Sequence, residues 1–274
     1  MTTTDRPRDP FGEWVDALEA RHLAELSISE VGRALRALSS CYVERRGRLP
    51  EGAALSGAGK RAAFALFYAP VHFFIVRHIV RARPAAEVAA IEDLGCGTGA
   101  AGAAWALESP GAVVHGIDRH PWAVAEASWT YRQLGVRGQA RQGDFTRTRL
   151  RPRPGGGIVA AWALNEVPDA NRAGVLETLL AARADGAAVL VVEPIARRVS
   201  PWWQEWSRAF EDAGGRADEW RMTAALPSRQ RQLARAAGLR PDELTARSLF
   251  AGPSAALTRR RRPARDRNPP GPAA

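Results

Sequence analysis

From residue 88 onward the chain alternates short apolar runs with helical patterns, and this alternation constrains the fold more than any other feature. Strands are predicted at 88–94, 112–118, 136–144, 157–164 and 187–193. Parallel strands need a long crossover between them, usually a helix, so the spacing favours a parallel sheet. The run "AAVLVVE" is apolar on both faces, as a central parallel strand is. We therefore predict an α/β domain with a mostly parallel sheet and helices on both faces.

The remaining segments extend this core at both ends. Helices are expected near 201–213 and 227–238, followed by strands at 243–250 and 254–260 that pair as an antiparallel ending and bring the sheet to seven strands. Residues 11–50 have helical spacing, with a capping box formed by Ser27 and Glu30. A Gly/Pro connector at 48–60 precedes a long helix that ends near residue 82 and is bent at Pro70.

These segments predict four regions. They are a disordered N-terminus at 1–10, an N-terminal helical cap at 11–82, the α/β domain at 83–260, and a disordered basic, proline-rich tail at 261–274. The most hydrophobic stretch, 62–80, is interrupted by proline, histidine and arginine, so a buried helix is favoured over a bilayer span.

The composition excludes several classes of protein. With 46% hydrophobic and 25% charged residues the chain has an ordinary globular balance. Cys41 and Cys96 are the only cysteines, which argues against a disulfide framework or a four-cysteine metal site. The histidines show no metal-ligand spacing, so no metal is predicted, and no apolar signal segment begins the sequence. We expect a soluble, cytoplasmic protein without a membrane partner.

The net charge of +10 raises the question of an acidic partner. Much of the excess lies in the tail "TRRRRPARDRNPPGPAA", for which a solvated, unpacked segment is the simpler interpretation. An RNA contact through a basic surface stays open as the alternative.

The stretch "IEDLGCGTGAAG", residues 91–102, carries the chemistry. A glycine-rich turn between a strand and a helix lets the backbone approach a ligand and directs N–H groups at an anionic group. Two registers fit. Gly97, Gly99 and Gly102 spell the dinucleotide pattern G-x-G-x-x-G, whereas Asp93 followed by Gly95, Gly97 and Gly99 spells D-x-G-x-G-x-G.

Electrostatics favours the second register. It puts Asp93 at the carboxyl end of its strand, inside a binding crevice, where an acid stabilises a cationic ligand and repels a pyrophosphate. The first register instead buries this carboxylate within the sheet, which is unfavourable without a partner.

The second register resembles the first motif of class I S-adenosylmethionine-dependent methyltransferases, for which "DLGCGTG" is a common spelling. The resemblance covers about residues 88–195 and implies their Rossmann-like fold and S-adenosyl-L-methionine as cofactor. It also implies that Asp118, after the second strand, grips the ribose, and that Asp144, with Phe145 beside it, contacts the adenine. Thr98 either caps the following helix or donates to the methionine carboxylate. The residues expected at the cofactor are Tyr68, Asp93, Gly95, Cys96, Gly97, Thr98, Gly99, Asp118, Arg119, Asp144, Phe145 and Trp162.

The acceptor is expected at the carboxyl end of the fourth strand, in "AWALNEVPDANR". Asn165 and Glu166 are the candidate catalytic residues there, although a turn former and a helix-start acid explain them equally well. Glu193 and Pro194 form a second rim after the fifth strand. The amino-methyltransferase motif of Asn or Asp followed by Pro-Pro-aromatic is absent, which argues against methylation of an exocyclic base amine.

The same stretch is similar to a narrower group, the methyltransferase-like proteins associated with the mitochondrial small ribosomal subunit and their bacterial relatives. The matching positions are Trp162, Leu164, Glu166, Pro168 and Arg172, and Tyr68 takes the place of their tyrosine before the first strand. The cysteines that hold an iron–sulfur cluster in that group are missing here.

Three functions are therefore open. The first is methyl transfer by direct displacement to a small molecule or to ribosomal RNA. The second is a non-catalytic, cofactor-binding ribosome assembly factor, and the third is a nicotinamide-dependent oxidoreductase. Trp202, Trp206 and Phe210, spaced four residues apart, indicate either a core-facing helix stripe or an aromatic wall over the acceptor.

Overall fold

The computed structural model describes residues 9–44, 55–83, 87–148, 150, 154–196, 200–223, 225–239 and 242–253, with only the backbone for 40–44. The expected disordered tail, the expected strand at 254–260 and most of the expected disordered N-terminus lie outside these residues. Residue 10 of that N-terminal region already begins the first helix, α1.

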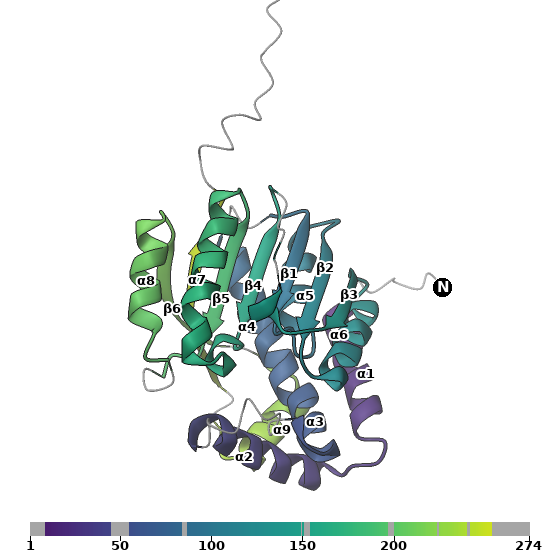
Figure 1. Ribbon diagram of the computed structural model, residues 1–274. Helices are drawn as coiled ribbons and strands as arrows, with labels where there is room; N and C mark the ends of the chain where they lie inside the picture. Colours follow the sequence, from purple (N-terminus) through teal and green to yellow (C-terminus); the bar gives the residue numbers. More distant parts are fainter. Residues whose placement is uncertain are drawn as a thin grey trace, which may run out of the picture.

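The described residues form one seven-stranded sheet in the order β3-β2-β1-β4-β5-β7-β6 (Figure 1). The strands are β1 (Ala90–Leu94), β2 (Val113–Asp118), β3 (Arg137–Gln142), β4 (Gly157–Ala161), β5 (Ala188–Glu193), β6 (Arg216–Thr223) and β7 (Glu243–Ala251). The first five pair in parallel, and β7 runs antiparallel to both of its neighbours. The predicted mostly parallel, seven-stranded sheet is confirmed.

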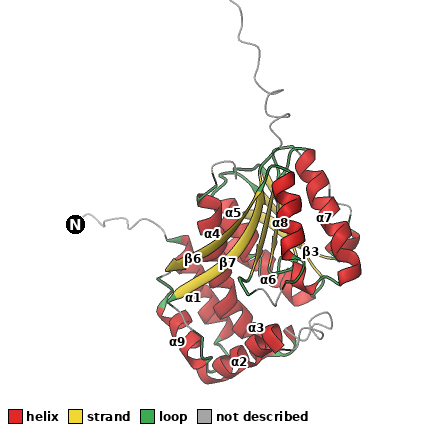
Figure 2. Ribbon diagram, turned by 90° about the vertical axis from the view of Figure 1, so that its left-hand side faces the viewer, coloured by secondary structure: helices red, strands yellow, loops and turns green. Residues whose placement is uncertain are grey.

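Helices cover both faces of the sheet, as predicted (Figure 2). One face is covered by α4 (Ala69–Arg81), α5 (Ala100–Leu107) and α6 (Pro121–Gln133), and the other by α7 (Asp169–Ala184) and α8 (Trp203–Asp212). Each face has its own buried apolar cluster. Trp202, Trp206 and Phe210 belong to the second cluster and are at most 7% exposed, so the stripe faces the core.

The last pairing of the sheet differs from the prediction. Both edges of β7 are occupied, one by β5 and the other by β6, so the predicted pairing of 243–250 with 254–260 is wrong. The sequence of β6, "RADEWRMT", is rich in charged residues because this strand lies at the edge of the sheet, where several of its side chains are exposed to water. Because it contains no apolar run, the strand was not predicted from the sequence.

The long apolar helix is bent by a π-helical turn. It runs through α3 (Ala58–Ala63), η3 (Phe64–Tyr68) and α4, and Pro70 lies in the first turn of α4. Proline has no backbone N–H, so Pro70 cannot donate the helical hydrogen bond to the carbonyl of Leu66, four residues earlier. The side chain of Gln230 donates to that carbonyl at 3.0 Å instead. Ala58–Arg81 is long and apolar enough to cross a membrane, but 67% of its most apolar window is buried inside the domain, as a core helix is.

The helical cap combines segments from both ends of the chain. It contains α1 (Pro10–His22) and α2 (Ile28–Glu44), and Ser27 and Glu30 form the predicted capping box before α2. The β6–β7 connection adds α9 (Ser228–Ala236), which packs against α2 and η3. Figure 1 shows α2, α3 and α9 together below one end of the sheet. The cap is fixed to the domain at Glu126 of α6, a fully buried carboxylate that contacts His22 at 2.7 Å and Arg21 at 3.3 Å.

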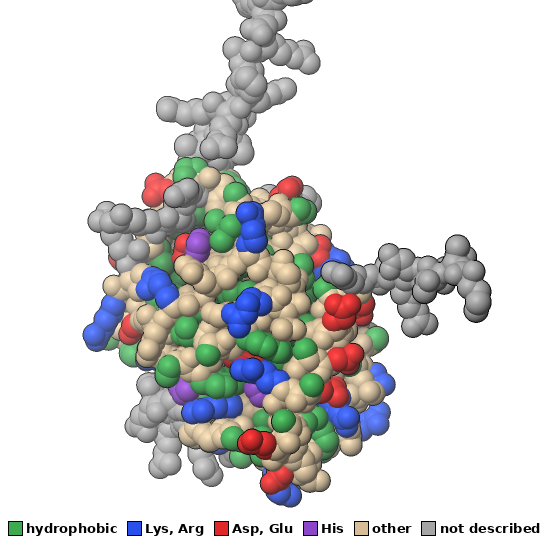
Figure 3. Space-filling view, turned by 90° about the vertical axis from the view of Figure 1, so that its right-hand side faces the viewer, with side chains coloured by type: hydrophobic (Ala, Val, Ile, Leu, Met, Phe, Trp, Pro, Cys, Tyr) green, Lys and Arg blue, Asp and Glu red, His purple; other side chains and the backbone are tan. Residues whose placement is uncertain are grey.

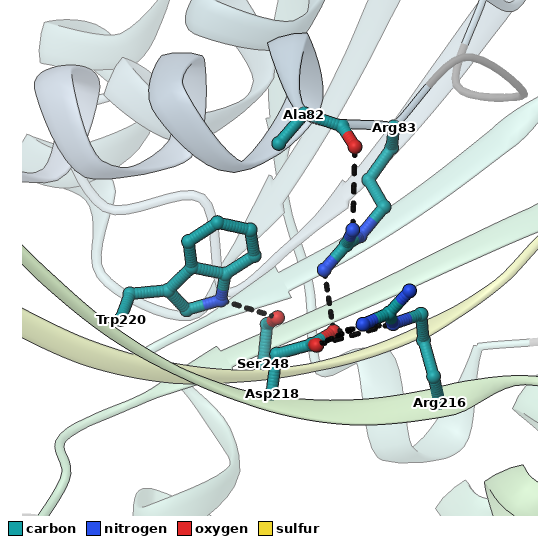
Figure 4. Close-up of polar contacts among 6 residues, drawn as sticks. All are labelled: Ala82, Arg83, Arg216, Asp218, Trp220 and Ser248. Carbon is teal, nitrogen blue, oxygen red and sulfur yellow. Dashed lines mark hydrogen bonds and ion pairs between the residues drawn. The ribbon is translucent and has the colours of Figure 1, made fainter.

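A second junction joins the end of α4 to the sheet edge (Figure 4). Asp218 of β6 lies between Arg83, at 2.5 Å, and Arg216, at 2.6 Å, and the guanidinium of Arg83 lies over the ring of Trp220. The side chains of Asp218 and Arg83 are only 16% and 11% exposed, so this charge pair is protected from solvent screening.

We expect Asp218→Ala to lower the free energy of unfolding by about 2 kcal/mol, because it leaves the half-buried Arg83 charge without its carboxylate. Asp169→Ala is the matched control, since the Asp169 side chain is 92% exposed and its ion pair with Arg172 contributes little. Urea unfolding followed by circular dichroism measures both. Equal losses for the two variants would contradict this account of the junction.

Candidate functional site

The glycine turn follows β1, at the point where the sheet order reverses. β1 lies between β2 and β4, and ligands bind open α/β sheets outside the carboxyl ends of strands at such a reversal. Gly95, Gly97 and Gly99 have φ angles of +64°, +51° and +76°, which side chains other than glycine rarely adopt. The three glycines of the D-x-G-x-G-x-G register are therefore the ones that form the turn.

Asp93 lies behind this turn. It is 1% exposed, and its Oδ2 accepts a hydrogen bond from the backbone N–H of Gly102 at 3.0 Å. A Cβ on Gly102 would lie 2.6 Å from that oxygen, so the fourth glycine lets α5 approach β1 closely. Burial raises the pKa of Asp93 to about 7, and the nearby charge of Asp118 adds to the rise. Asp93 thus holds the first turn of α5, and its predicted contact with a cofactor stays a prediction.

Two other residues of the turn are buried. The N-cap of α5 is Gly99, without a side-chain cap, so the capping role suggested for Thr98 is wrong and its donation to a carboxylate remains a prediction. Burial also raises the pKa of the Cys96 thiol well above its usual value, which keeps it protonated and unreactive.

Asp118 ties the end of β2 to the glycine turn. One carboxylate oxygen accepts from the backbone N–H of Gly97 at 2.9 Å and the other from that of His120 at 2.8 Å. His120 in turn caps α6, because its Nδ1 accepts from the backbone N–H of Trp122. The carboxylate is half-buried, and each oxygen keeps a lone pair for a ligand hydroxyl.

Asp144 and Phe145 border the other side of the turn. The Asp144 carboxylate accepts from the backbone and the hydroxyl of Thr146. Burial opposes the change, but these bonds and the charges of Arg119 and Arg147 hold the pKa of Asp144 below its usual value. The ring of Phe145 lies 3.4 Å from where a Cβ on Gly95 would be, so it closes over the turn.

The carboxyl ends of β4 and β5 are joined by a rim of hydrogen bonds. Glu193, which is fully buried, accepts from the backbone N–H of Leu164 at 3.1 Å and from the side-chain amide of Asn165. The Asn165 oxygen accepts from Ser200 at 2.8 Å and from the indole of Trp202 at 3.3 Å. Both polar groups of the Asn165 side chain are therefore bonded within the protein and hold the rim. This agrees with the structural, turn-forming alternative given in the sequence analysis.

Glu166 lies beside this rim. It follows Asn165 in a short 3₁₀ turn, Leu164–Glu166, and is half-buried. Burial raises its pKa to about 7; the charge of Asp118 adds to the rise, while Arg119 lowers it. A carboxyl group with this pKa can accept a proton near neutral pH.

Four aromatic side chains face this end of β4. Trp162 stacks on His72 of α4, with ring centres 3.6 Å apart and planes 6° apart. The ring centre of Tyr68 lies 5.7 Å from that of His72 and 5.8 Å from that of Phe64. The ring of Phe64 lies 3.4 Å from where a Cβ on Gly97 would be. The cap therefore reaches the glycine turn through these side chains.

The structure brings most of the predicted residues together at the carboxyl ends of neighbouring strands. Around the turn formed by Gly95 and Gly97 lie Asp118, Arg119, Asp144, Phe145 and Glu166. Tyr68 and Trp162 approach it through their contacts with His72. Sequence reasoning missed Phe64 and His72. Their spacing with Tyr68, at every fourth residue, was the available signal for one shared helix face.

Comparison with known proteins agrees with this geometry. Residues 91–186 match the family described as "Methyltransferase domain". This match and the order of the sheet support the class I methyltransferase superfamily. No curated protein matches the chain.

Solved methyltransferase structures share the fold. A protein from Nostoc punctiforme assigned as an O-methyltransferase has 15% identity and a TM-score of 0.50, with 80% of this chain and 72% of that chain covered. The mitomycin 7-O-methyltransferase MmcR has 16% identity and a TM-score of 0.50, with 89% and 73% covered. The antiparallel β7 between β5 and β6 also distinguishes this sheet from the dinucleotide-binding order 3-2-1-4-5-6.

The buried carboxyl groups predict an unusual pH dependence of stability. The pKa of Asp93 is raised to about 7 and that of Glu193 to about 8, mainly by burial, whereas unfolded carboxyls titrate near 4. Between these values the folded protein holds protons that the unfolded chain has lost, so stability falls as the pH rises from about 5 to about 8. Urea unfolding at several pH values measures this fall.

Glu193→Gln is the variant that tests the cause, because glutamine does not titrate. We expect it to be less stable at pH 5, where the rim loses an acceptor, and to show a shallower fall toward pH 8. An unchanged slope would show that another group is responsible.

Proposed function

We propose that the chain is an S-adenosylmethionine-dependent methyltransferase that binds its cofactor over the turn Gly95–Gly99 and transfers the methyl group by direct displacement. The observation that carries this proposal is the pairing of the glycine turn with Asp118, whose carboxylate is bonded to the Gly97 N–H. The methyltransferase domain match covers the same segment.

The residues at the turn fit this cofactor. The three glycines with positive φ let the turn pack closely against the protein, because an added Cβ would meet Ala163, Phe64 or Tyr131. Free N–H groups at the start of α5 suit a carboxylate. Asp118 and Glu166 suit hydroxyl groups and positive charge, and they repel the pyrophosphate of a nicotinamide dinucleotide.

Each residue then has a role in binding. The N–H groups at the start of α5 bind the methionine carboxylate, Asp118 accepts the ribose hydroxyls, and Asp144 and Phe145 lie on the adenine side. When bound, S-adenosylmethionine supplies a methyl group on a sulfonium, and a nucleophile that attacks the methyl carbon in line displaces the thioether. The protein contributes by orienting the two reactants and excluding water, and this requires no metal.

We expect S-adenosylhomocysteine to bind with micromolar affinity and Asp118→Ala to weaken it at least about tenfold, because the ribose loses its acceptor. Isothermal titration calorimetry measures both. Glu177→Gln removes an exposed carboxylate of α7, far along the chain from the turn, and is expected to bind as the parent does. Equal affinities of Asp118→Ala and the parent protein would contradict the cofactor site.

A further inference from the structure

The four aromatic side chains described above, Phe64, Tyr68, His72 and Trp162, contact one another next to the glycine turn and are here called the aromatic wall. All four are half-buried, whereas their neighbours Ala65, Leu66 and Phe67 on the same helix are buried. The wall thus leaves aromatic surface uncovered next to the glycine turn. Partly exposed aromatic faces beside a cofactor site are suited to stack a ligand.

Trp162 is held in an unfavourable backbone conformation to reach this wall. Its φ is +56°, the only positive value for a residue other than glycine among the described residues. Its backbone N–H donates to the carbonyl of Val192 at 2.8 Å, which fixes the peptide. Such a conformation costs about 1–3 kcal/mol and is found mostly at functional sites. Here it accompanies the parallel stacking of the indole on His72.

The wall carries no charge at neutral pH. Burial lowers the pKa of His72 to about 3, so its imidazole is neutral, and burial raises the pKa of Tyr68, so its hydroxyl stays protonated. The His72 and Trp162 rings stack face to face, so a planar ligand can extend this stack on the outer face of one of the two rings. A cage for a cationic amine instead surrounds the cation with several ring faces.

The charged groups around Glu166, which follows Trp162 by one helical turn's length of sequence, are two carboxyl groups and one guanidinium. Burial raises the pKa of Glu166, the charge of Asp118 adds to the rise, and Arg119 lowers it. This balance disfavours a polyanion such as RNA as the acceptor. On the face drawn in Figure 3, the described residues present both basic and acidic side chains and no continuous basic stripe of the kind that marks a nucleic-acid contact.

We infer that the acceptor is a small planar aromatic compound with a hydroxyl group, which stacks on the aromatic wall while Glu166 takes the hydroxyl proton. This inference rests on the proposed function. The hydroxyl oxygen forms the new bond to the methyl carbon, the carbon–sulfur bond breaks, and its electron pair stays on sulfur. The products are a methyl ether, S-adenosylhomocysteine and protonated Glu166, which returns its proton to water.

The first test is binding to the protein saturated with S-adenosylhomocysteine. The probes are phenol, catechol, 2-naphthol, 7-hydroxycoumarin and 8-hydroxyquinoline, measured by calorimetry. We expect at least one probe to bind, and His72→Leu and Trp162→Leu each to weaken it about tenfold or more, because one ring is the probe's stacking partner and the other holds that ring in place. S-adenosylhomocysteine binding by His72→Leu stays within about threefold of the parent. Trp129→Leu, a half-buried tryptophan of α6, is the matched control and leaves probe binding unchanged.

The second test is methyl transfer to the bound probe, followed by mass spectrometry of the ether. We expect the rate to rise with pH with a midpoint of about 7. Glu166→Gln lowers kcat about 100-fold or more and removes this midpoint, while the probe still binds. Glu177→Gln keeps both the rate and the profile.

The outcomes separate this inference from the function on which it rests. If S-adenosylhomocysteine does not bind, the proposed function fails and the inference fails with it. If it binds but none of the five probes binds or is methylated, only the acceptor class is overturned. Transfer to sarcosine or to an RNA hairpin in place of the probes overturns it as well.

Discussion

The hydrogen bond between the buried carboxylate of Asp93 and the backbone N–H of Gly102 is the contact on which the rest of the site depends. It satisfies an N–H group in the first turn of α5, which has no carbonyl partner within its own helix. It also fixes α5 against β1, so the intervening glycines must turn sharply with positive φ. The ring of Tyr131 packs where a side chain on Gly99 would lie and closes the turn from α6. Three neighbouring elements are thereby locked around one carboxylate.

Carboxylates at the ends of neighbouring strands divide the work at this edge. Asp93 and Glu193 are buried and accept backbone N–H groups, and burial raises the pKa of both. Asp118 and Glu166 are half-buried, and in the proposed function they face the ligands. Burial distinguishes the two pairs, since Asp118 also accepts backbone N–H groups.

Much of the fold was predictable because apolar runs and helical spacing report burial directly. All five parallel strands were predicted, and so were α8 and α9, which follow them. β6 was missed because an edge strand with charged residues has no apolar run, and the participation of α9 in the cap depends on tertiary packing alone. Within the site, the glycine register was recognisable from spacing. The contacts of Asp93 and Asn165 were not, since a sequence does not reveal which carboxylates and amides partner each other in the fold. His72 was overlooked because its stacking partner, Trp162, is 90 residues away in a conformation that propensity disfavours.

The central claim is that this acid-lined glycine turn binds a cationic thioether derivative of adenosine. A crystal structure of the chain grown with S-adenosylhomocysteine tests it most directly. The account predicts the methionine carboxylate against the start of α5, next to the turn Gly95–Gly99, the ribose hydroxyls on Asp118 and the sulfur directed toward Trp162 and Glu166. Electron density for the ligand away from this turn, or a turn that binds only a pyrophosphate when the crystals are soaked with a nicotinamide dinucleotide, would contradict it.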